Sequence, residues 1–268
     1  MASKHMDELM NKIEVADIGI CILLAEKREL EAHLEELNNK KLSAKEDEYY
    51  DYEKLSGRKA GMELEFSLQS SAMKNVENCL QDIQETGKLI SFVATNGRGT
   101  MFLYGAGGVA YTPGVPKALI QKVKQAKTER LKPIYVALGN KDRYYVAFHN
   151  GSADWKGPKA LDKCLRKSKI PVSVSFGSTY DSYFVVFKDG SWEYQGRGIP
   201  DDLEDKLSDR ADLTCVTLGP SGEWFIRARN GRLWWGGVSD AFDQDIRDID
   251  DLHFVDFGED GTYLFSYD

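Results

Sequence analysis

The sequence predicts an α+β protein, with a long coiled-coil-like helical hairpin followed by a β-rich domain of about five β-β-β-helix repeats. Apolar residues at heptad spacing and the absence of proline over residues 6–40 predict the helical part. Glycines that return at intervals near 40 residues predict the repeats. We expect the hairpin over residues 7–87 and the repeat domain over residues 88–268, and we interpret residues 1–6, MASKHM, as a cloning remnant.

Two interleaved heptad series predict the first helix. One series is Met6, Ile13, Ile20, Lys27 and Leu34, and the other is Leu9, Ala16, Leu23, Leu30 and Leu37. Such a double series forms the seam of a coiled coil, and only Lys27 interrupts it. A charge at that position could set the register or the stoichiometry, because a buried charge penalises wrong assemblies.

A second helix is predicted from Ser43 to about Thr86. Ser43 and Glu46 fit a capping box, and Gly87 fits a C-terminal stop. Apolar residues recur at heptad spacing between these ends, namely Phe66, Met73 and Leu80. The hairpin would either pack on the rest of the chain or dimerise into a four-helix arrangement, and both possibilities stay open.

Recurring glycines define the repeat. One column consists of Gly139, Gly177, Gly219 and Gly258, separated by 38, 42 and 39 residues. A second column, Gly151, Gly190 and Gly231, follows Asn or Asp, which is the signal of a tight hairpin turn. We expect Gly108 to be the member of this second column in a degenerate first repeat.

The sequence pattern within each repeat predicts three strands and a short helix. An apolar run ends at the first glycine, an alternating run leads to the hairpin turn, and a third strand carries an aromatic residue. The aromatic position holds Trp155, Tyr194 and Trp235, with Thr112 expected in the first repeat. The helices carry apolar pairs four residues apart, namely Leu161/Leu165, Leu203/Leu207 and Phe242/Ile246.

Antiparallel β units of this length with recurring glycine and aromatic residues resemble the blades of β-propellers. The resemblance covers residues 89–268 and concerns architecture alone. The Trp-Asp dipeptide and the Gly-His signature of the commonest propeller family are absent, so no named family is indicated. A helix also takes the place of a fourth strand. The resemblance implies a small ring, with a curved open stack of repeats as the alternative.

The segment EWFIRARNGRLWWGG, residues 223–237, holds the candidate binding residues. Its Trp235 fits the repeat and predicts packing, whereas four residues differ from those at equivalent positions of other repeats. These four are Arg227, Arg229, Arg232 and Trp234. Arg and Trp often anchor protein interfaces, so we predict a protein-binding surface here, with freely varying solvated side chains as the alternative.

A sugar-binding lectin is the alternative function. Trp155, Tyr194 and Trp235, each near carboxylates, would suit sugar sites between repeats. A lectin should carry equivalent sites in several repeats, whereas a protein-binding surface should concentrate in one divergent repeat. The differences cluster in residues 223–237, which favours a non-enzymatic scaffold whose hairpin oligomerises or tethers and whose repeats bind a protein.

Other function classes find less support in the sequence. We find no nucleophile paired with a base, no metal-ligand spacing and no phosphate-binding loop, so we expect no catalytic residue, metal or cofactor. A formal net charge of −8 disfavours nucleic acid as partner. The longest apolar stretch, residues 18–25, is too short to cross a bilayer. Four scattered cysteines favour a reducing, cytoplasmic compartment. Residues 159–169 are locally basic and could bind an anion or an acidic partner, a solvated helix face being the alternative.

Overall fold

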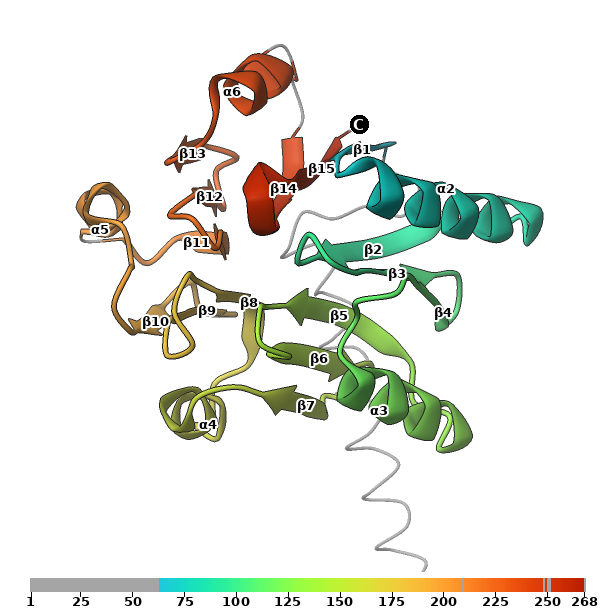
Figure 1. Ribbon diagram of the computed structural model, residues 1–268. Helices are drawn as coiled ribbons and strands as arrows, with labels where there is room; N and C mark the ends of the chain where they lie inside the picture. The colour runs from blue at the N-terminus through green and yellow to red at the C-terminus, as the bar shows by residue number, and fades with distance from the viewer. Residues whose placement is uncertain (1–62, 209, 248, 250–251, 268) are drawn as a thin grey trace, which may run out of the picture. The chain divides into compact units, whose positions relative to one another are not determined.

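The computed structural model describes residues 63–267 apart from residues 209, 248, 250 and 251. Over this range the chain forms five three-stranded antiparallel sheets, which we call blades 1 to 5 (Figure 1). Blade 1 holds β2 (Ile90–Thr95), β3 (Thr100–Tyr104) and β4 (Gly108–Tyr111), and blade 2 holds β5 (Pro133–Leu138), β6 (Tyr144–Phe148) and β7 (Ala153–Lys156). Blade 3 holds β8 (Pro171–Phe176), β9 (Tyr183–Phe187) and β10 (Trp192–Gln195), and blade 4 holds β11 (Leu213–Leu218), β12 (Trp224–Ala228) and β13 (Leu233–Gly236).

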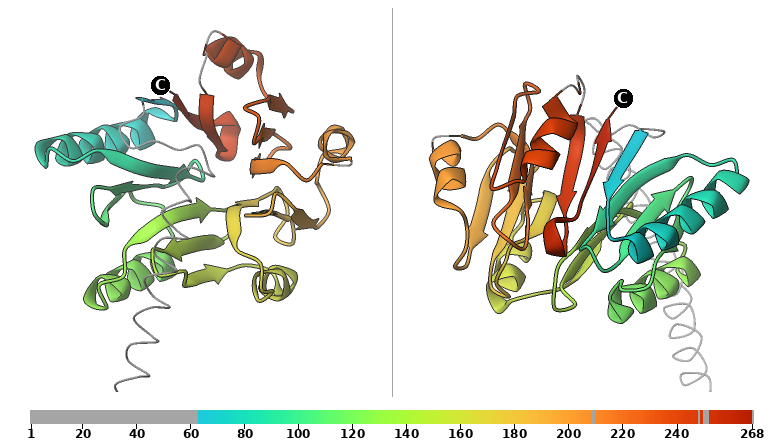
Figure 2. Two further views of the ribbon diagram at one scale, coloured as in Figure 1. Left: turned by 180° about the vertical axis from the view of Figure 1, so that it is seen from behind. Right: turned by 45° about the horizontal axis from the view of Figure 1, so that its top comes forward.

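A helix follows the third strand of each of these blades, on the outer side of the sheets (Figures 1 and 2). These helices are α3 (Lys117–Thr128), α4 (Lys159–Leu165), α5 (Asp201–Leu207) and α6 (Asp240–Arg247). Their predicted apolar residues face inward, as Leu161, Leu203 and Phe242 are at most 1 % exposed. The β-β-β-helix repeat predicted from the sequence is therefore confirmed.

The fifth blade is assembled from both ends of the described chain. It contains β14 (Leu252–Phe257) and β15 (Tyr263–Tyr267), and its third strand is β1 (Glu63–Ser67). β1 pairs antiparallel with β15, and Phe66 lies opposite Leu264 as Trp155 lies opposite Tyr145 in blade 2. After β1 comes α2 (Ser70–Glu85), so the fifth blade follows the same element order as the other four.

This strand corrects one prediction. Heptad spacing predicted a helix of the hairpin at residues 63–67, but these residues form a strand that completes a β sheet. Phe66 belongs to the column of outer aromatic residues rather than to a heptad seam. Residues 70–85 of the predicted second helix do form a helix, α2, and Gly87 follows it with a φ of +65°. The rest of the predicted hairpin, including the two heptad series and the capping box at Ser43, lies outside the described residues, as do residues 1–6.

The five inner strands close a ring. β2 contacts β5, β5 contacts β8, β8 contacts β11, β11 contacts β14, and β14 contacts β2. At the seam between blades 5 and 1, the Thr95 backbone N–H donates to Oδ2 of Asp256 at 2.8 Å, and the Glu259 N–H donates to the Asn96 carbonyl at 3.1 Å. These contacts support the propeller-like ring and exclude an open stack.

The two glycine columns have different physical causes. A Cβ on Gly139 would lie 2.8 Å from the Phe176 Cβ, so the first column leaves room for the next blade. Gly151 of the second column has a φ of +82°, which the hairpin turn requires. In blade 1 the residue in this conformation is Gly107, not Gly108, and the aromatic position is Tyr111, not Thr112, because Tyr111 pairs with Met101. The expected residues of blade 1 are therefore displaced by one position, because its turn contains several closely spaced glycines.

Among the described residues, no helix combines the length and apolar composition needed to cross a bilayer.

Candidate interaction surfaces

The outer aromatic residues bind the helix of their own blade. Trp235 Nε1 donates to Oδ1 of Asp243 at 3.1 Å, and the Tyr194 hydroxyl donates to Oε1 of Glu204 at 2.8 Å. Trp155 occupies the same position, and its interaction with Asp162 is among the causes that lower the pKa of that carboxyl, after the hydrogen bond from Arg166. The bond from Trp235 is the largest of the causes that lower the pKa of Asp243. Each carboxylate is the fourth residue of its helix, so these bonds are a feature of the repeat.

This arrangement bears on the predicted sugar sites. The carboxylates next to Tyr194 and Trp235 already accept hydrogen bonds from those same aromatic residues, and Asp162 beside Trp155 accepts one from Arg166. The Tyr194 ring also stacks on Phe184, with ring centroids 5.6 Å apart, and on Trp192 at 5.7 Å. A sugar would therefore compete with packing that is already present.

A second recurring contact joins neighbouring blades at the rim. In each case a cation on or just after one helix meets the middle of the third strand in the next blade. The pairs are Lys122 with Asp154 at 3.4 Å, Lys167 with Glu193 at 2.6 Å, and the Arg210 guanidinium over the Trp234 ring at 4.1 Å. Trp234 thus replaces a carboxylate by a cation–π contact. Trp234 differs from the residues at this position in other repeats, and its contact with Arg210 of the same chain accounts for the difference.

The four candidate residues of residues 223–237 do not form one cluster. Arg227 lies opposite Leu233 and Ile226 lies opposite Trp234, so Arg227 and Trp234 point to opposite faces of the sheet. Arg229 is exposed, and its Nη2 donates to the Lys188 carbonyl of blade 3 at 3.4 Å. Arg232 is exposed in the hairpin turn.

Arg143 is a buried cation that the sequence analysis missed. Its side chain is fully buried, and its guanidinium donates to the carbonyls of Gly177 at 2.7 Å, Thr179 at 2.7 Å and Ser182 at 2.9 Å. These acceptors belong to the turn after the inner strand of blade 3. Burial is the largest effect on the pKa of Arg143 and lowers it to about 10. The residue joins blades 2 and 3 and is not exposed to a partner.

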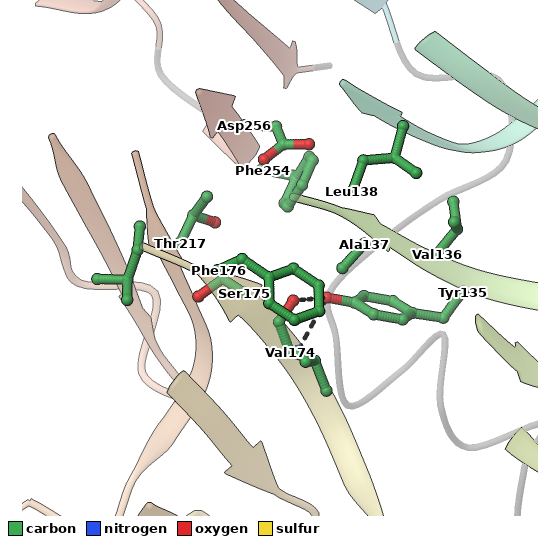
Figure 3. A pocket seen from close by; sticks show the side chains of 11 residues that line it. Tyr135, Val136, Ala137, Leu138, Val174, Ser175, Phe176, Thr217, Phe254 and Asp256 are labelled. Atoms are coloured by element: carbon green, nitrogen blue, oxygen red, sulfur yellow. Dashed lines mark hydrogen bonds between the residues drawn. The ribbon is translucent and has the colours of Figure 1, made fainter. Parts of the chain in front are cut away.

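A small polar cavity lies among the inner strands (Figure 3). Its volume is about 10 Å³, and its lining includes Ser175, Thr217 and Asp256 from three blades. The Ser175 Oγ is buried and has no hydrogen-bond partner among the described residues. A cavity of this size holds about one water molecule. The described residues contain no group of three His, Cys, Asp or Glu that could hold a metal ion.

Charge is distributed unevenly around the ring. Residues 117–169 contain fourteen Lys or Arg and four Asp or Glu, whereas residues 201–268 contain six and seventeen. Five of the exposed cations in the first segment lie on α3 or just after it and make no ion pair among the described residues. They are Lys117, Lys124, Lys127, Arg130 and Lys132, which we call the basic face. A count of charge by segment would have found this surface in the sequence.

Comparisons with known proteins identify no family. No family model matches the chain, and no curated protein matches its sequence. Among solved structures, Prp20p from Saccharomyces cerevisiae, described with its binding to Gsp1p and histones, matches at 13% identity and a TM-score of 0.44. That match covers 78% of this chain and 65% of the Prp20p chain, so this chain spans less than two thirds of that protein.

Two further matches are weaker. The C-terminal domain of gp131 from bacteriophage phiKZ matches at 15% identity and a TM-score of 0.35, over 57% of this chain and 53% of that chain. Yeast RCC1 (Prp20) bound to Kap60 matches at 14% identity and a TM-score of 0.33, over 56% and 44%. The five sheets of this chain, rather than these matches, establish its β-repeat architecture.

Proposed function

We propose that this chain is a non-enzymatic protein-interaction module whose closed β ring presents the basic face to an acidic segment of a partner protein. One observation carries the proposal. Five exposed cations without an ion pair among the described residues gather on α3 and the segment after it, in a protein with a formal net charge of −8.

Electrostatics favours such a partner. Lys124 and Lys127 are three residues apart on α3 and repel each other, and an acidic segment would relieve this repulsion. Such contacts speed association and give specificity more than affinity, and salt weakens them. The net negative charge of the whole chain repels a nucleic acid, which carries a charge at every phosphate, more strongly than it repels a short acidic segment, and this favours protein as the acidic ligand.

The residues first singled out from the sequence supply a second candidate surface for the same function. Arg229 and Arg232 are exposed at the blade 4 turn, beside Arg227 and Trp234 in the neighbouring strands. Residues 7–62, the part of the predicted hairpin that lies outside the described residues, would tether or oligomerise the ring. A sugar site between repeats remains the alternative function, but no free aromatic face supports it at Tyr194.

The test is capture of partners from a nuclease-treated lysate of the protein's own source. The basic-face variant carries Lys117→Gln, Lys124→Gln and Lys127→Gln, and the matched control carries Lys74→Gln, Lys88→Gln and Lys141→Gln. All six lysines are exposed, so both variants lose the same charge. We expect the wild type and the control to retain the same discrete proteins at about 50 mM salt and to release them at about 300 mM, where charges are screened within a few ångströms. The basic-face variant should retain none of them.

Equal retention by both triple variants would contradict the proposal. If only the double variant Arg229→Ala with Arg232→Ala lost the partner proteins, the contact would lie at blade 4. Release of many glycoproteins by a free sugar would favour the lectin. Partners that are retained only when the nuclease is omitted would indicate a nucleic acid ligand.

A further inference from the structure

α4 and α5 occupy equivalent places in consecutive blades. Each follows the third strand of its blade and contains seven residues. Their buried leucines, Leu161 and Leu203, are both the third residue. The carboxylates that interact with the outer aromatic residue, Asp162 and Glu204, are both the fourth. The two helices can therefore be compared residue by residue.

This comparison shows a reversal of charge at two positions. The first residue is Lys159 in α4 and Asp201 in α5, and the fifth is Lys163 in α4 and Asp205 in α5. All four side chains are exposed, and none has an ion pair among the described residues. Residues four apart lie on one face of a helix, so each helix presents a pair of like charges.

The reversal lies where the charge around the ring changes sign. The first helical residue is Lys117 in α3 and Lys159 in α4, then Asp201 in α5 and Asp240 in α6. The boundary falls between blades 2 and 3, whose helices both lie on the outside of the ring (Figure 1). No ion pair joins α4 to α5 among the described residues, so both like-charged pairs are open to a second molecule.

We infer that α4 of one copy of this chain docks antiparallel on α5 of a second copy, and that the reciprocal contact forms at the same time. A two-fold axis between α4 and α5 produces this arrangement, because a two-fold contact uses the same surface on both partners. Lys159 then faces Asp205 of the second copy, and Lys163 faces Asp201. Matching spacing and opposite sign in one chain favour a second copy over an unrelated acidic protein.

The contact is small. A helix of seven residues is about 10 Å long, so the buried area falls at the low end for specific interfaces. Exposed ion pairs contribute little individually and are screened by salt. The dimer is therefore weak, with a dissociation constant in the micromolar range or above. It uses neither Lys117, Lys124 nor Lys127, so it is independent of the proposed function.

Sedimentation velocity of the full chain over a range of concentrations tests the inference. We expect a concentration-dependent increase in mass at about 50 mM salt, with a dissociation constant about tenfold higher at about 300 mM. Association through the N-terminal residues would appear as a separate association equilibrium in these data, and the following variants would leave it unchanged. Lys159→Glu with Lys163→Glu should abolish the salt-sensitive step, and so should Asp201→Lys with Asp205→Lys.

Rescue by opposite charges provides the decisive control. An equal mixture of the two double variants should associate, because each supplies the charge that the other lacks. The quadruple variant should associate with itself, because both signs are reversed together. Far-UV circular dichroism and thermal unfolding would confirm that each variant is folded.

Several results would overturn the inference. These are the absence of a salt-sensitive step in the wild type, an unchanged step in folded double variants, and failure of both the mixture and the quadruple variant to associate.

Discussion

The junction between blades 2 and 3 and the seam between blades 5 and 1 join neighbouring blades with opposite chemistry. At the first, the buried Arg143 of blade 2 donates to carbonyls in the turn of blade 3. At the second, Asp256 of blade 5 accepts the N–H of Thr95 in blade 1. One junction is held by a buried cation and the other by a buried carboxylate, although the strands around them have the same arrangement.

The difference shows what the repeat specifies. In both blades the column glycine donates its N–H to the residue just before the second strand, from Gly139 to Arg143 at 2.9 Å and from Gly258 to Thr262 at 2.8 Å. The backbone bond is thus common, while the side chain at that position changes from Arg to Thr. The repeat determines where polar groups are buried between blades, and each junction satisfies them with its own side chains.

Arg143→Met tests this comparison with the largest expected effect. The change keeps much of the side-chain volume but leaves the carbonyls of Gly177, Thr179 and Ser182 without their buried donor. We expect the free energy of unfolding, measured by urea denaturation, to fall by about 3 kcal/mol or more. The exposed Arg166→Met serves as the control and should change it by less than about 1 kcal/mol. Equal effects of the two changes would show that the buried donor does not hold the junction.

Asp256→Ala tests the seam. It removes the acceptor of the Thr95 N–H, and we expect a loss of about 2 kcal/mol in the same measurement. Asp256→Asn retains a carbonyl acceptor and should lose less. If Asn and Ala destabilise the protein equally, the bond to Thr95 is not what the carboxylate contributes.

Trp234 allows two kinds of contact at the rim to be compared. Blades 3 and 4 are joined there by a cation–π contact, whereas blades 2 and 3 are joined by an ion pair. Trp234→Ala removes the ring under Arg210, and we expect a loss of about 1–2 kcal/mol, since apolar contact is lost with it. Trp234→Glu restores the chemistry of Glu193 in blade 3 and should recover part of that loss. Thermal unfolding would show this as an intermediate melting temperature, and a Glu variant less stable than the Ala variant would contradict it.

The smallest expected effect concerns a hairpin turn. Asp189 accepts hydrogen bonds from the Ser191 backbone and hydroxyl, as Asn150 does from Ser152 in blade 2. Hydrogen bonds from Ser191, and next from Lys169, lower the pKa of Asp189 to about 2. Because the pKa is lower in the folded state, the ionised group stabilises the protein above its unfolded pKa of about 3.9 and loses this effect as the pH falls towards 2.

Asp189→Asn should therefore reduce the fall in melting temperature between about pH 4 and pH 2, by a small amount because the carboxylate is largely exposed. Lys206→Gln, at an exposed lysine outside this turn, is the control. An identical pH dependence of the wild type and Asp189→Asn would contradict the prediction.

Features that depend on neighbouring residues were predictable. Gly151, Gly190 and Gly231 were placed in turns because a positive φ is a local requirement. The helices α4 and α5 were predicted because apolar residues four apart indicate a buried face. The roles of Trp234 and Arg143 were not predictable in this way. Their partners, Arg210 and the turn at residues 177–182, lie 24 to 39 positions away and carry no local signal.

The strand β1 shows most clearly what local sequence patterns could not predict. Phe66 fits a heptad with Met73 and Leu80 as well as it fits a strand, so its own neighbours could not decide between the two. Pairing with β15, about 200 residues later in the chain, decides it, because the edge of β15 offers backbone hydrogen bonds that only a third strand can complete. The sequence by itself determined the β-β-β-helix unit and its recurrence about five times. Only the tertiary structure decided that residues 63–67 complete the fifth blade and close the ring, because closure joins segments at opposite ends of the described chain.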